Sequence, residues 1–94
     1  MIIIRLRKRN DEIVRIRIQG HARKGRLKDR VCTGVAVLSR TLASMLGEED
    51  AIAYGKFNLR IPKHARKEAM YTVYGYEMLQ RFSPENVRII EEVA

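Results

Sequence analysis

Apolar and polar residues alternate along the first twenty positions of the chain. Ile2, Ile4 and Leu6 mark one side of the alternation, which resumes after a polar turn at residues 10–11 and runs to Ile18. A period of two residues predicts two β-strands joined in a hairpin, with only one face covered. The other face carries mostly arginine, so we expect it to meet solvent, a partner subunit or RNA.

Two later segments have the period of an amphipathic helix. Residues 30–46 repeat apolar side chains at spacings of three and four, and Gly47 follows as a stop signal. Residues 63–82 repeat them in the same way after Pro62, which is suited to open a helix. Asp29 is well placed to act as the N-cap of the first helix.

The remaining elements are strands. Alternation predicts one strand over residues 51–61, with Gly55 as a candidate bulge, and a last strand over 87–93. The predicted order ββαβαβ indicates an α/β (α+β) two-layer sandwich, in which two helices cover one face of a four-stranded mixed sheet. At 94 residues the chain has room for one core, so we expect residues 1–94 to form a single domain.

Positive charge is concentrated in the first third of the chain. Residues 1–30 contain eleven Lys and Arg and three Asp and Glu, so they account for the whole formal net charge of +8. Such asymmetry is typical of contact with nucleic acid, although a solubilising surface explains the charge equally well. The candidate contacts to RNA are Arg5, Arg7, Arg15, Arg17, Arg23 and Lys24.

The sequence also favours a cytoplasmic protein. No apolar run approaches the length needed to cross a bilayer, and the apolar stretch after Met1 is too short for a secretory signal. Cys32 is the only cysteine, and a lone thiol suits a reducing compartment. Because the histidines, the cysteine and the acidic residues lack zinc-site spacing, we expect no metal and no cofactor.

Cys32 and His21 are the residues best suited to chemistry. Cys32 is predicted in the first turn of the helix, where free backbone N–H groups and the helix dipole favour a thiolate. His21 precedes it by eleven residues, which is enough for the polar loop over 20–29 to fold back and let the imidazole take the thiol proton. A buried structural cysteine and an ordinary loop histidine are the alternative.

Further residues complete a candidate site around this pair. Gly20 would let a substrate approach the backbone closely. Asp29 could orient His21 or balance its charge, in addition to capping the helix. Backbone N–H groups near Thr33 and Gly34 would be the donors to an oxyanion.

This segment resembles the catalytic stretch of the ribosomal-processing cysteine proteases. The resemblance rests on Gly20, His21, Ala22, Asp29, Val31 and Cys32. It implies a dyad of Cys32 and His21 supported by Asp29, and a substrate-binding role for Ala22 beside Gly20, Thr33 and Gly34. It also implies removal of an N-terminal extension from the precursor of a large-subunit ribosomal protein, a homodimer, and a loop that orders around substrate.

Two features differ from the family pattern. Ala36 stands where the family commonly has serine, and the loop between His21 and Cys32 is one residue short and unusually basic. The main alternative function is a non-catalytic RNA- or ribosome-binding module that uses the basic hairpin and loop. The tyrosines lie outside the basic third, which argues against an RNA-binding surface with interleaved aromatics.

Overall fold

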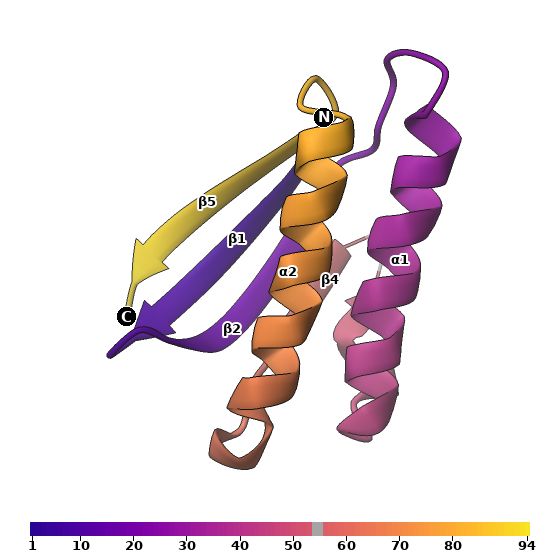
Figure 1. The fold of residues 1–94 in the computed structure, drawn as a ribbon. Coiled ribbons are helices and arrows are strands. Elements are labelled where there is room, and N and C mark those ends of the chain that lie inside the picture. Colours follow the sequence, from indigo (N-terminus) through magenta and orange to yellow (C-terminus); the bar gives the residue numbers. More distant parts are fainter. Residues whose placement is uncertain (54–55) are drawn as a thin grey trace.

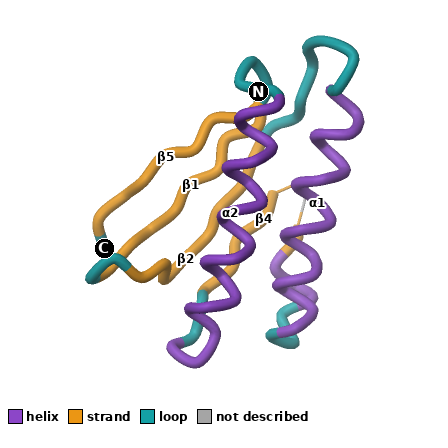
Figure 2. The backbone as a smooth tube through the Cα atoms, viewed as in Figure 1, coloured by secondary structure: helices purple, strands orange, loops and turns teal. Residues whose placement is uncertain are grey.

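One mixed sheet and two long helices form two layers in the computed structural model, which describes residues 1–53 and 56–94 (Figure 1). Both helices lie on the same face of the sheet, which confirms the predicted two-layer sandwich (Figure 2). The long elements are β1 (Ile2–Arg9), β2 (Glu12–Gln19), α1 (Lys28–Met45), β4 (Lys56–Arg60), α2 (Arg66–Phe82) and β5 (Val87–Val93). They follow the predicted order ββαβαβ, and a short additional strand, β3 (Ile52–Ala53), makes the described sheet five-stranded, in the order β3-β4-β2-β1-β5.

The predicted hairpin forms the centre of the sheet. β1 pairs with β2 in antiparallel fashion and with β5 in parallel, and β2 continues antiparallel to β4. Asn10 and Asp11 join β1 to β2 with φ angles of 51° and 65°. Positive φ at both central positions is the geometry of the tight turns that match strand twist, and Asn and Asp tolerate it better than most residues.

The segment predicted as one strand over 51–61 is divided. Ile52–Ala53 forms the short strand β3, which pairs antiparallel with β4 at the sheet edge, after a 3₁₀ turn over Glu49–Ala51. The alternation that favours a strand begins only at Phe57, so the sequence pattern does not predict the separate short strand that precedes it. The candidate bulge at Gly55 lies outside the described residues.

The first helix begins earlier than predicted. Lys28 is its first residue and Leu27 its N-cap, and no side chain caps the helix start. Asp29 is therefore not the N-cap but the second residue of the first turn, where its carboxylate still faces the favourable end of the helix dipole.

No helix in residues 1–53 and 56–94 is long and apolar enough to cross a membrane.

The two helices approach closely because each has a glycine at the contact. A Cβ on Gly75 of α2 would lie 2.7 Å from Cδ1 of Leu38. A Cβ on Gly34 of α1 would lie 3.0 Å from Cδ1 of Leu79. Gly34 was expected in a substrate site, but the structure gives it a packing role between the helices.

A buried polar pair connects the two helices: Ser39 belongs to α1 and Tyr76 to α2. Tyr76 is fully buried, and its hydroxyl lies 2.6 Å from the hydroxyl of Ser39, which donates to the carbonyl of Val35 at 2.6 Å. Burial raises the pKa of Tyr76 from 10.0 to about 12, while the hydrogen bond to Ser39 opposes the rise. The folded chain therefore keeps this proton at pH values where the unfolded chain releases it.

We expect the free energy of unfolding to fall as pH rises from 10 to about 12, by no more than about 2–3 kcal/mol from this residue. The loss occurs because the unfolded state binds fewer protons than the folded state in that window. Urea unfolding at a series of alkaline pH values measures it. In Tyr76→Phe the free energy of unfolding should fall less steeply with pH than in wild type. The control Tyr74→Phe, which changes an exposed tyrosine, should show the wild-type slope. Equal slopes in wild type and both variants would contradict the raised pKa of Tyr76.

Candidate active site

The loop that follows β2 starts with a glycine that no other residue can replace. Gly20 has φ +91°, and a Cβ there would lie 2.1 Å from the carbonyl oxygen of Met1. The chain passes directly over the Met1 backbone at this point, so the glycine serves a close approach within the protein. This geometry fixes the direction in which His21 leaves the strand.

His21 and Cys32 line one hollow. Its volume is about 220 Å³, and it lies between the end of β2, α1 and β4. Its wall includes Gly20, His21, Cys32, Val35, Ala36 and Phe57. His21 is exposed and Cys32 is half-buried, so a substrate can reach both side chains from solvent. The loop thus brings together the two residues that the sequence singled out for chemistry.

A backbone donor is aimed at the thiol. The N–H of Ala22 donates to Sγ of Cys32 at 3.2 Å, and Ala22 is itself buried. A donor at that distance stabilises negative charge on the sulfur, which is the form that attacks a carbonyl. The helix start contributes less than predicted, because Cys32 is the fifth residue of α1 and lies beyond its four free N–H groups.

The imidazole and the thiol are not hydrogen-bonded to each other within the described residues. Proton-transfer contacts often form only when substrate closes the site. The arrangement can therefore support nucleophilic attack by sulfur, with an exposed histidine on the same hollow as the proton carrier.

Asn86 anchors the loop, although no pattern in the sequence marks it as part of the site. It is buried, and its Oδ1 accepts from the N–H of Arg23 at 3.1 Å and of Lys24 at 3.0 Å. Its Nδ2 donates to the carbonyl of Lys24 at 2.6 Å and to Oγ of Ser83 at 2.8 Å. Both acceptor sites and both donors of the amide are thus used. The loop next to His21 is tied to the turn between α2 and β5.

We expect Asn86→Ala to release this loop. The change leaves two N–H groups and one carbonyl without their partner, at about 1–3 kcal/mol for each group that stays buried. Amide hydrogen exchange at Arg23 and Lys24 should become about tenfold faster or more. Asn86→Asp, which keeps the acceptor and loses both donors, should show a smaller change; unchanged exchange in Asn86→Ala would refute the anchor.

The other candidate site residues lie elsewhere. Asp29, Thr33 and Gly34 line a separate apolar groove of about 620 Å³ between α1 and α2. Within the part of the chain that the structure describes, Asp29 makes no ion pair, so nothing there joins it to His21. Thr33 and Gly34 lie inside the helix, where their N–H groups belong to its own hydrogen bonds. The earlier helix start explains why they are unsuited to hold an oxyanion.

Comparison with known proteins gives one family. The family model described as cysteine protease Prp matches residues 1–88. A search of curated proteins gives no match.

Solved structures share the fold. The protein SMU.848 from Streptococcus mutans has a TM-score of 0.80 and 19% sequence identity, covering 100% of this chain and 99% of that chain. The essential ribosomal processing protease Prp from S. aureus, in complex with a covalently linked product peptide, has a TM-score of 0.80 and 19% identity, covering 98% and 100%. Its complex with a substrate peptide has a TM-score of 0.80 and 18% identity, with the same coverage.

Proposed function

Because the chain belongs to the cysteine protease Prp family, and so is a cysteine peptidase, we propose that it cleaves an N-terminal extension from a large-subunit ribosomal protein during ribosome maturation. One observation carries the choice of residues: His21 and Cys32 line the same hollow, and the Ala22 N–H is aimed at the sulfur. The S. aureus protein of the same fold is a ribosomal processing protease that binds a substrate peptide, which supports the choice of substrate.

The proposed reaction uses two steps. His21 takes the proton of the Cys32 thiol, and the sulfur attacks the scissile carbonyl to form a tetrahedral intermediate. His21 then gives that proton to the leaving amine as the C–N bond breaks, which leaves a thioester on Cys32. In the second step His21 takes a proton from water and the hydroxide attacks the thioester carbonyl. The C–S bond then breaks, the carboxylic acid product leaves, and His21 returns the proton to the sulfur.

Supporting residues have distinct parts in this proposal. Gly20 lies in the wall of the hollow and Ala22 donates its N–H to the thiol, and both would contact the substrate backbone. Asp29 would balance the charge of the His21 imidazolium, which requires the loop to move toward the helix start when substrate binds. Thr33 and Gly34 act in helix packing and at the groove instead of in the chemistry.

The proposal extends to the surroundings of the enzyme. The whole chain, residues 1–94, acts as one peptidase domain, as a homodimer in the cytoplasm, and contacts ribosomal RNA through its basic residues. In this proposal the protein is an enzyme that also binds RNA. A non-catalytic binding module is no longer a separate candidate, because the family is one of proteases.

The test is cleavage of the host's own precursor ribosomal protein, read by intact mass. We expect a loss of mass from the amino terminus of the precursor and no change in the same protein made without its extension. A precursor that keeps its full mass, in the presence of folded enzyme with a reduced thiol, would disprove the proposed substrate.

A further inference from the structure

The sheet face opposite the helices is an array of cationic side chains, and we propose that it binds the phosphate backbone of RNA. We call it the open face, because in residues 1–53 and 56–94 both helices cover only the other side (Figure 2). Its cations come from all four long strands: Arg5, Arg7, Arg15, Arg17, Lys56, Arg60 and Arg88. Ile3, Ile90 and Glu92 lie on the same face. The proposal rests on the proposed function only for the choice of RNA as the polyanion.

The strand register sets arginines directly against one another. Arg5 pairs with Arg17 and Arg7 with Arg15 across β1 and β2, and Arg15 also pairs with Arg60 across β2 and β4. Neighbouring strands are about 4.8 Å apart, and like charges in direct opposition destabilise a sheet. The fold therefore sets three pairs of arginines on neighbouring strands, and within residues 1–53 and 56–94 the Arg7–Arg15 and Arg15–Arg60 pairs have no carboxylate between them that an external polyanion would have to displace.

Few internal groups neutralise this array. Glu92 of β5 forms ion pairs with Arg17 and, at 3.8 Å, with Arg5. Arg15 donates to Oδ1 of Asn58 at 2.7 Å, a neutral acceptor. Among the described residues, neither Arg7 nor Arg60 has an ion pair. The open face therefore presents guanidinium groups with unused donors, which match phosphate oxygens in pairs.

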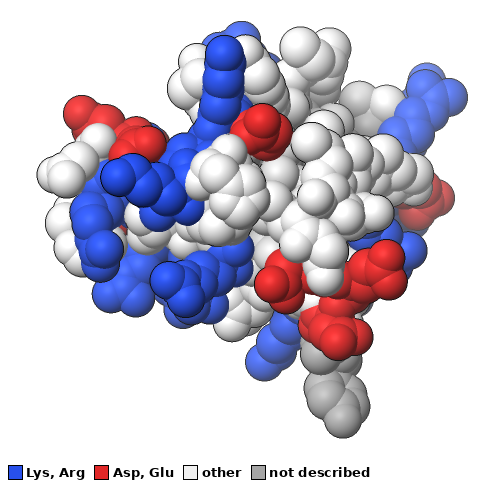
Figure 3. Space-filling model, turned by 90° about the horizontal axis from the view of Figure 1, so that it is seen from below, with Lys and Arg blue, Asp and Glu red and all other residues white. Residues whose placement is uncertain are grey.

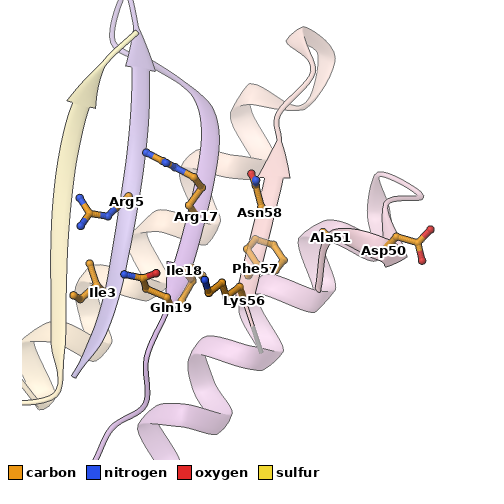
Figure 4. Close-up of a pocket in the computed structure, with 10 residues that line it drawn as sticks. All are labelled: Ile3, Arg5, Arg17, Ile18, Gln19, Asp50, Ala51, Lys56, Phe57 and Asn58. Carbon is orange, nitrogen blue, oxygen red and sulfur yellow. The ribbon is translucent and has the colours of Figure 1, made fainter. Parts of the chain in front are cut away.

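Two hollows in the open face could seat phosphates. The first has a volume of about 440 Å³ and includes Arg5, Arg17, Lys56 and Asn58, with Asp50 on its outer wall (Figure 4). The second, of about 210 Å³, is lined by five arginines: Arg7, Arg9, Arg15, Arg60 and Arg66. Figure 3, which views the molecule from below, shows most Lys and Arg on the left with some Asp and Glu among them, and a further group of Asp and Glu at the lower right.

The same charges argue against other partners. A second copy docked through this face on a two-fold axis would bring two sets of arginines together, which disfavours the open face as a contact between copies of this chain. β1 and β2 contain no aromatic residue, and Phe57 of β4 points into the core. Without aromatics to stack on bases, binding would follow the backbone, independent of sequence and strongly dependent on salt.

The test compares two triple variants that remove equal charge. Arg7→Ala/Arg15→Ala/Arg60→Ala removes the centre of the open face, and Arg40→Ala/Lys67→Ala/Arg81→Ala removes exposed cations of the helices. The probe is a fluorescein-labelled RNA hairpin, titrated at several salt concentrations. We expect the open-face variant to bind about tenfold more weakly or worse and to lose about three units of the salt slope, one for each phosphate contact. The helix variant should bind like wild type.

Further outcomes decide the source of the effect. Equal losses in both triple variants, or a loss confined to Arg23→Ala/Lys24→Ala in the loop, would overturn the proposal. Binding to phosphatidylserine vesicles without binding to the RNA hairpin would also overturn it. The open-face variant should unfold at the same or a higher urea concentration than wild type, because repulsion is removed. Peptide cleavage by this variant should be unchanged, so failure of RNA binding and failure of the proposed peptidase substrate are read separately.

Discussion

Replacing Cys32 with alanine is expected to lower kcat/KM for cleavage of the precursor by about 10⁴-fold or more. The thiol forms the covalent bond in the proposed reaction, and the chain contains no second cysteine to replace it. The side chain is only half-buried, so the variant should fold like wild type. Intact mass of the precursor over time measures the loss.

Two controls accompany this variant. Ser44→Ala, an exposed change on the same helix, should cleave at the wild-type rate. With a slowly hydrolysed peptide ester, wild type should gain the mass of the acyl group, and Cys32→Ala should gain none. Cleavage at the wild-type rate by Cys32→Ala would remove this thiol from the mechanism.

Replacing His21 with alanine is expected to lower kcat by about 10²–10⁴-fold, because the proton transfers lose their carrier. His21 is exposed, so the free energy of unfolding should stay near that of wild type. The chain supplies a matched control in His64, its other histidine, which is also exposed and lies in the 3₁₀ turn before α2. His64→Ala should keep the wild-type rate.

The comparison of the two histidines decides the assignment. If both variants lose the same activity, the effect belongs to charge or stability and not to a proton carrier in the hollow. If His21→Ala cleaves at the wild-type rate, the base must be another group.

Local patterns predicted the main elements of the fold. The alternation in Ile2, Ile4 and Leu6 identified the central hairpin, because a strand with one covered face must alternate. The apolar spacing identified both helices, although α1 starts two residues earlier than predicted. That start was misplaced because Asp29 looked like a cap, whereas no side chain caps the helix.

The details of the site depend on contacts that no local pattern records. Asn86 reaches the loop at Lys24 across 62 positions of sequence, and in the sequence it is only a polar residue in a turn. The place of Asp29 and Thr33 on the groove between the helices follows from how α1 packs against α2, a contact between distant segments. The place of His21 and Cys32 on the same hollow, by contrast, requires only a loop long enough to fold back, which the sequence shows.

The tie between Asn86 and the loop also sets the order of events during synthesis. The ribosome makes Cys32 and His21 early, but β5 and the Asn86 amide emerge only after α2 is complete. β1 can form its parallel pairing only after β5 has been made, and pairings between segments this far apart form late because a long loop must close first. We therefore expect an unfinished chain to carry the thiol and the imidazole without a fixed loop between them, so proteolytic competence arrives with the last strand.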